Sequence, residues 1–177
     1  MYFSNFPEIA YDSIGDGEVK VVTNLLKRVA VRAKTIATSA VYDTYDVKNG
    51  ETPEMIADKM YGSTEYHWVI LLLNNITDRY HQWPMDNRQF LAHLNDKYSD
   101  VNALHHYEIY QTSGDTTKKI NIGTDKTGYS DEDILTITNR EYEQDLQDVI
   151  RKIKVLDPKY LEQFETEFKT MINKSVW

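Results

Sequence analysis

The hydrophobic pattern in the first half of the chain changes from strand-like to helix-like. Residues 40–47 are rich in Val, Tyr and Thr and predict a strand, which Asn49–Gly50 ends in a turn of positive φ. Thr52 is placed to cap a helix that starts at Pro53, where the missing N–H is tolerated, and Gly62 ends it in a left-handed cap. The apolar side chains that share one face of this helix are Ile56, Ala57, Met60 and Tyr61.

A second helix is predicted to begin near Thr64 and to end at Asn74–Asn75. We expect Trp68 to be the core of this small unit and Trp83 to close it. The segment between Tyr45 and Trp83 thus holds a strand, a tight turn, two short helices and a closing loop. The residues expected to hold the unit together are Ile56, Tyr61, Gly62, Trp68, Ile70 and Trp83.

An aromatic arm precedes this unit. Residues 1–11 carry Tyr2, Phe3, Phe6 and Ile9 ahead of a glycine-rich turn. Such an arm either packs on its own domain or docks on a partner, and we expect Phe3 and Phe6 to be partner anchors rather than core. After the turn, Thr23 can cap a short helix that runs to about Arg32.

The pattern after the closing loop predicts a helix, a hairpin and a helical C-terminal third. Asp86 is placed to cap the helix, and a short strand over residues 107–111 leads into a hairpin in which Ile120 and Ile122 alternate. The C-terminal third predicts a helix through Ile153. After a break at Asp157–Pro158, a last helix carries an apolar stripe that includes Tyr160, Phe164 and Phe168.

Composition narrows the function classes. The chain has 177 residues, 41% of them hydrophobic, which is enough for a packed core. Its net charge of −8 argues against a phosphate-binding surface, so we expect no nucleic-acid partner. There is no cysteine, which excludes disulfides and thiolate metal sites. The N-terminus does not resemble a signal peptide, and the longest apolar run, Trp68 to Leu73, is too short to cross a membrane.

The sequence offers little catalytic or metal-binding chemistry. His105–His106 is the only histidine pair, and adjacent residues of a regular strand point to opposite faces, which disfavours chelation of one metal. The carboxylates do not lie in apolar patterns that would raise a pKa for acid–base work. We therefore expect no catalytic residue, metal, cofactor or small-molecule substrate.

The segment VKNGETPEMIADKMYGSTEYHWVILLLNN resembles the LysM signature, which implies an α+β fold with a small βααβ core. The order of elements along nearly the whole chain is similar to the LysM-like wedge protein 53 family of T-even-type contractile phages. The resemblance implies an N-terminal arm and short helix over residues 1–40 and a LysM-like domain over residues 41–85. Residues 86–177 would then form a helix, a hairpin insert and a C-terminal helical extension.

The resemblance also implies a structural role. Members of that family resemble clamps that tie adjacent wedges together around the hub during baseplate assembly. The expected partners are other wedge subunits and neighbouring wedges, in six copies or a multiple, in a virion tail baseplate assembled in the host cytoplasm. The residues that suit such contacts are Tyr2, Phe3, Phe6, Ile9, Tyr160, Phe164 and Phe168.

A carbohydrate-binding module is the alternative, because LysM domains bind peptidoglycan or chitin in a groove between two loops. Here the residues at the matching positions are Asn49, Gly50, Thr52, Asn74 and Asn75. A tail-associated cell-wall hydrolase is a third possibility, but the chain lacks a recognisable pair of carboxylates in distinct environments, which glycoside hydrolysis needs.

Overall fold

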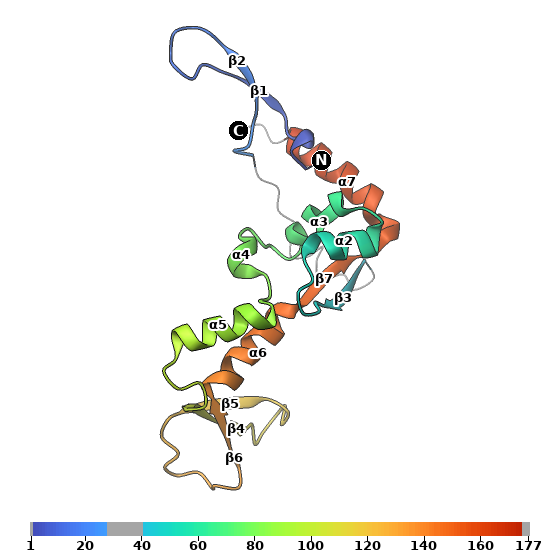
Figure 1. The fold of residues 1–177 in the computed structure, drawn as a ribbon. Helices are drawn as coiled ribbons and strands as arrows, with labels where there is room; N and C mark the ends of the chain where they lie inside the picture. The colour runs from blue at the N-terminus through green and yellow to red at the C-terminus, as the bar shows by residue number, and fades with distance from the viewer. Residues whose placement is uncertain (1, 28–40, 175–177) are drawn as a thin grey trace. The chain divides into compact units, whose positions relative to one another are not determined.

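The computed structural model describes residues 2–27 and 41–174 (Figure 1). The chain folds into two compact units. The first unit combines residues 1–83 with residues 152–177, and the second consists of residues 84–151. Helices and small antiparallel sheets occur in both units, so the predicted α+β class is confirmed. Each unit is described separately below.

The first unit is built on a two-stranded sheet whose strands come from distant parts of the sequence. Strand β3 (Tyr42–Asp46) pairs antiparallel with β7 (Lys152–Leu156), with Tyr42 opposite Leu156. The predicted helix through Ile153 is wrong in its last turn, because α6 (Asn139–Arg151) ends before it. Ile153 fits a helical spacing, but it also alternates with exposed lysines, and pairing with β3 decides in favour of the strand.

Two helices between these strands match the sequence prediction closely. Helix α2 (Pro53–Tyr61) begins after Thr52, whose hydroxyl accepts a hydrogen bond from the Met55 amide, and ends at Gly62 with φ 71°. A short 3-10 turn, η2 (Thr64–Tyr66), leads into α3 (His67–Leu73). A further short helix, α4 (Arg79–Gln82), follows. The βαα order predicted for this segment is therefore confirmed, and the second strand of the sheet is β7.

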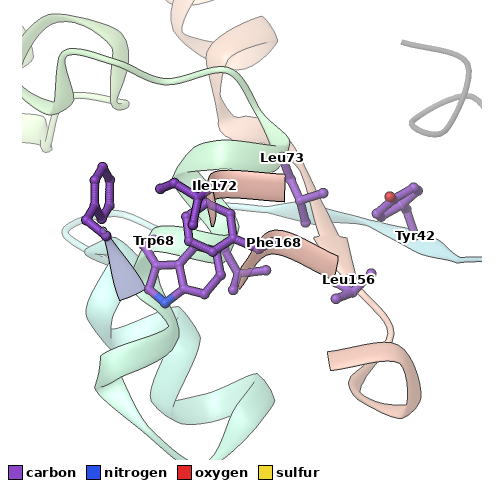
Figure 2. Close-up of a cluster of buried hydrophobic side chains, with 8 residues drawn as sticks. Tyr42, Trp68, Leu73, Leu156, Phe168 and Ile172 are labelled. Atoms are coloured by element: carbon purple, nitrogen blue, oxygen red, sulfur yellow. The ribbon is translucent and has the colours of Figure 1, made fainter. Parts of the chain in front are cut away.

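The core of the first unit has two adjoining clusters. One lies around Ile56 and Ile70, both fully buried, together with the inward side chains of β7. The other lies around Trp68, whose ring packs on Phe168 (Figure 2) with 4.6 Å between the ring centroids. The centroid of the Phe164 ring is 6.1 Å from that of Trp68. Tyr61 contacts both clusters and its hydroxyl accepts a hydrogen bond from the Leu156 amide at 3.0 Å. Burial raises the pKa of the Tyr61 phenol to about 12.

The last helices complete this core. Asp157 caps a 3-10 turn, η3 (Pro158–Tyr160), as predicted, and α7 (Leu161–Lys174) follows. Phe168 and Ile172 of α7 are almost fully buried against α3 and β7 in the second cluster. The C-terminal helix is therefore part of the core of the first unit.

The N-terminal segment forms a hairpin. A 3-10 turn, η1 (Tyr2–Asn5), precedes strands β1 (Glu8–Tyr11) and β2 (Lys20–Thr23), which pair antiparallel (Figure 1). Thr23 ends β2 and does not cap a helix, so the start of that predicted helix is wrong; its continuation over residues 28–32 lies outside the described residues. The β-branched residues of β2 favour a strand once β1 offers a partner.

The second unit packs two helices with a three-stranded sheet. Helix α5 (Asn87–Lys97) starts at Asp86 with a complete capping box, as expected. Strands β4 (Leu104–Tyr110) and β5 (Lys119–Gly123) form the predicted hairpin. Strand β6 (Ile134–Thr138) was not predicted; it pairs with the other edge of β4, giving the order β5-β4-β6, and leads directly into α6.

A buried carboxylate ties α5 to α6 in the second unit. Glu143 of α6 is 4% exposed and accepts hydrogen bonds from Lys97 at 2.6 Å, Tyr98 at 2.8 Å and His93 at 3.2 Å. Burial by itself would raise the pKa of this carboxyl, but these donors outweigh it and lower the pKa below its ordinary value. Glu143 is therefore a paired structural anion, which explains how a carboxylate is accommodated in this core.

Candidate functional site

The residues predicted to line a sugar groove lie just before the start of α2 and just after the end of α3. Asn49 and Gly50 form the turn after β3, with Gly50 at φ 77°, and Thr52 caps α2. Asn74 ends α3, and Asn75 follows in a left-handed conformation with φ 54°. Backbone geometry therefore favours glycine or an amide residue at two of these positions, Gly50 and Asn75, for local structural reasons.

The turn after β3 is closed by a polar network around Glu51. Its carboxylate accepts hydrogen bonds from the Tyr45 hydroxyl and from the Lys48 amide, each at 2.9 Å, and Lys59 lies 3.8 Å away. Burial opposes ionisation of Glu51, but these donors lower the pKa of its carboxyl on balance. The Trp83 indole N–H donates to the Glu51 carbonyl at 2.8 Å, so the closing loop seals this turn.

Asn74 connects α3 to the strand that arrives much later in the chain. Its side-chain amide donates to the carbonyls of Ile70 and Lys154, both at 2.8 Å, and its side-chain oxygen accepts from the Lys154 amide at 2.8 Å. The side chain therefore pairs with the backbone of β7 much as a strand would. Thr52, Glu51 and Asn74 use their polar atoms inside the fold, which leaves the sugar-groove prediction without support from their geometry.

The predicted partner-binding residues separate into buried and exposed sets. Phe6 is 9% exposed and belongs to the cluster around Trp68, so the expectation that Phe6 lies outside the core is wrong. Phe168 is 2% exposed, and Phe164 is partly buried against the same cluster. The exposed members of the predicted set are Phe3, Ile9 and Tyr160, and Tyr2 is described only by its place in η1.

The N-terminal hairpin carries many exposed apolar side chains, and the sequence reasoning identified only part of this set. All eight strand residues of β1 and β2 are exposed. β-branched residues on both sides of a glycine-containing turn were the signal that could have predicted the second strand. The exposed apolar residues between positions 9 and 26 are Ile9, Tyr11, Ile14, Val19, Val21, Val22, Leu25 and Leu26.

The hairpin is fixed at its base. The Asn24 amide donates to the Pro7 carbonyl at 2.8 Å, and the buried Asn24 side chain accepts from the Leu26 amide. Next to this junction, Phe6 packs into the core and Lys27 donates to the Ile172 carbonyl at 3.3 Å. The anchored base and the exposed strands divide the arm into a part that belongs to the fold and a part that presents apolar surface.

Exposed apolar side chains also occur on the helices of the second unit. Leu91 of α5 and Leu146 and Val149 of α6 are exposed, with Val149 at 72%. Each unit therefore carries exposed large apolar side chains.

The histidine pair differs from its expected geometry. A β-bulge between Leu104 and His106 breaks the alternation of β4, so the Nδ1 atoms of His105 and His106 lie 2.7 Å apart on the same side. The His105 ring also stacks on Tyr142 at 3.9 Å. In residues 2–27 and 41–174 there is no group of three or more His, Cys, Asp or Glu residues that could hold a metal ion. None of the helices over those same ranges is long and apolar enough to cross a membrane.

The family model described as base plate wedge protein 53 matches residues 1–154, which include the hairpin, both helices after β3 and all of the second unit. None of the curated proteins matches the chain.

Proposed function

We propose that this chain, which belongs to the base plate wedge protein 53 family, clamps adjacent wedges of a phage tail baseplate together. The family places the protein in the virion tail baseplate, with a structural role and with other baseplate proteins as neighbours. Clamping is the more specific proposal. The observation that carries it is the presence of exposed large apolar side chains on each of two compact units.

A clamp needs at least two contact surfaces, because it must hold one neighbour while it binds another. The first unit offers the exposed strands of the hairpin, and the second offers Leu91, Leu146 and Val149. Exposed apolar side chains that gather on one element, as in this hairpin, are typical of protein contacts. In a closed ring such contacts are heterologous, since one patch of a subunit meets a different patch of the next. Six copies or a multiple of six would follow from a ring of six wedges.

We further propose that the first unit is a LysM-like scaffold interrupted by the second unit. Its elements follow the order β3, α2, α3, β7, and residues 84–151 are inserted before the last strand. The residues expected to form the LysM-like core support this reading, because Ile56, Trp68 and Ile70 are buried. Trp83 packs against the cluster that holds Ile56 and Ile70. In this proposal the polar positions of the former ligand groove stabilise the fold.

The function is tested in the phage that encodes the chain. Infection without the chain is expected to yield wedges that do not join into baseplates, and supplying the chain in trans should restore complete particles. Quantitative mass spectrometry of purified tails should then find six copies or a multiple. Complete baseplates in the absence of the chain, or a chain that stays monomeric with every wedge subunit, would contradict the proposal.

A pull-down on insoluble peptidoglycan separates this function from carbohydrate binding. The chain should remain in the supernatant at micromolar concentration, because Thr52 and Asn74 are engaged within the fold. Clear binding at that concentration would favour the carbohydrate-binding module instead.

A further inference from the structure

The hairpin of β1 and β2 exposes apolar side chains on both of its faces. Directly opposite residues share a face, so one side carries Ile9, Tyr11 and Val22 with Lys20, while the other carries Ala10 and Val21 with Glu8 and Thr23. Val21 is 69% exposed and Tyr11 is 53% exposed. A sheet that rests on one surface alternates apolar and polar faces, so an apolar pattern on both faces fits a sheet covered from both sides.

The hairpin also lacks the usual support of a stable sheet. Among the residues that the structure describes, its sheet consists of β1 and β2 alone. A two-stranded hairpin is marginally stable in water unless a further strand or a packed surface supports it. Its base is nevertheless held by Asn24 and by the buried Phe6. The chain therefore fixes where the hairpin starts and leaves the strands to be covered by another molecule.

Charge indicates the chemistry of that molecule. Between positions 8 and 23 the chain carries Glu8, Asp12, Asp16 and Glu18 against a single lysine, Lys20. The loop between the strands holds three of these carboxylates, and Asp12 accepts hydrogen bonds from the backbone amides of its own turn. An acidic loop is attracted to a basic surface and repelled by another acidic one. A second copy of this hairpin would bring the same carboxylates together and is disfavoured.

We propose that the hairpin over residues 8–23 inserts into an apolar cleft, rimmed by Lys or Arg, on a different baseplate subunit. The inference rests on the proposed function and adds the docking element and the chemistry of its partner. Both apolar faces are covered in the cleft, and the acidic loop lies against the basic rim.

Photo-cross-linking in intact particles tests the insertion. A benzophenone amino acid is placed at Val21 or at Val22, which lie on opposite faces, and cross-linked peptides are identified by mass spectrometry. Both positions should link to one baseplate subunit other than this chain. Links to a second copy, links from one face alone, or no links from a chain that is incorporated would overturn the insertion.

Charge reversal tests the basic rim. Glu8→Lys combined with Glu18→Lys should reduce incorporation into baseplates about tenfold at low salt and less at high salt. The matched control combines Glu132→Lys with Asp133→Lys, which makes the same change of net charge in an exposed loop of the second unit. Unchanged thermal unfolding shows that each variant folds. Equal incorporation of both double variants would overturn the basic rim.

The two proposals fail in different ways. If the unmodified chain is absent from purified baseplates, the proposed function fails. If the unmodified chain joins wedges while Val21→Asp is incorporated just as well, only the insertion of the hairpin fails. If Val21 is covered in the interface, Val21→Asp should instead weaken binding of the chain to the baseplate about 30-fold.

Discussion

Replacement of Asn74 by alanine should destabilise the first unit, because this side chain joins α3 to β7. Two of its hydrogen bonds reach the backbone of Lys154, both at 2.8 Å, and a third reaches the carbonyl of Ile70. A net contribution of about 1 kcal/mol for each bond to β7 gives a loss of about 2 kcal/mol in the free energy of unfolding. Lys154 is itself exposed, so water can replace part of the hydrogen bonding that its backbone loses, and the loss of stability is at most this large.

Tryptophan fluorescence is the appropriate assay, because all three tryptophans of the chain fall within the residue ranges of the first unit. A loss of 1 kcal/mol lowers the Tm of a domain of this size by about 4–6 °C, so we expect a decrease of roughly 8–12 °C for Asn74→Ala. Asn74→Asp should destabilise at least as much, because it places a carboxylate oxygen against two carbonyl oxygens.

Asn173→Ala is the matched control. Asn173 is exposed on α7, and its amide donates to the Lys169 carbonyl one turn away. Its effect should stay within about 0.5 kcal/mol, as for most surface substitutions. If Asn74→Ala unfolds at the same temperature as this control and the unmodified chain, the connection between α3 and β7 does not stabilise the unit and the reasoning is refuted.

Three further predictions concern the core and its charges. Phe168→Ala should lower the free energy of unfolding, measured in urea, by about 3–5 kcal/mol. Met171 is 49% exposed on the same helix, so Met171→Ala should change stability little, and equal effects would contradict the packing of Phe168 on Trp68. Phe6→Ala should destabilise the first unit by about 2–4 kcal/mol. Phe3 is 55% exposed, so Phe3→Ala should not; the reverse order of effects would contradict the burial of Phe6 in the core. Because the folded-state pKa of Glu143 is lowered, its stabilisation is present above the ordinary carboxyl pKa and is lost as pH falls through the folded-state value. Hydrogen-exchange protection factors of the second unit, corrected for the intrinsic exchange rate at each pH, should therefore fall on acidification, and Glu143→Gln should remove that dependence.

Local signals in the sequence predicted most helix ends correctly. Thr52, Asp86 and Asp157 cap the elements that follow them, and Gly62 ends α2 in the left-handed conformation. These predictions succeed because a cap depends on hydrogen bonds within about one helical turn of the capping residue. The buried positions Ile56 and Ala57 of α2 followed from helical spacing for the same reason.

Strand pairing and burial of the arm depended on contacts that no local pattern contains. The spacing of Ile153 predicts a helix, yet Ile153 lies in β7 and pairs with β3. Thr23 predicts a helix start, yet it ends β2, whose partner is β1. His105 and His106 meet because a bulge in β4 breaks the alternation on which the sequence argument relied.

The sequence by itself determined the α+β class, the helix caps, the family resemblance and the apolar character of the N-terminal arm. The tertiary structure decided which strand pairs with β3, and which aromatic residues of the arm are available to a partner. A strand gains its hydrogen bonds from a partner that can lie anywhere along the chain, whereas a helix gains them from its own neighbours. For that reason the buried Phe6 and the exposed hairpin beyond it could be separated only in three dimensions.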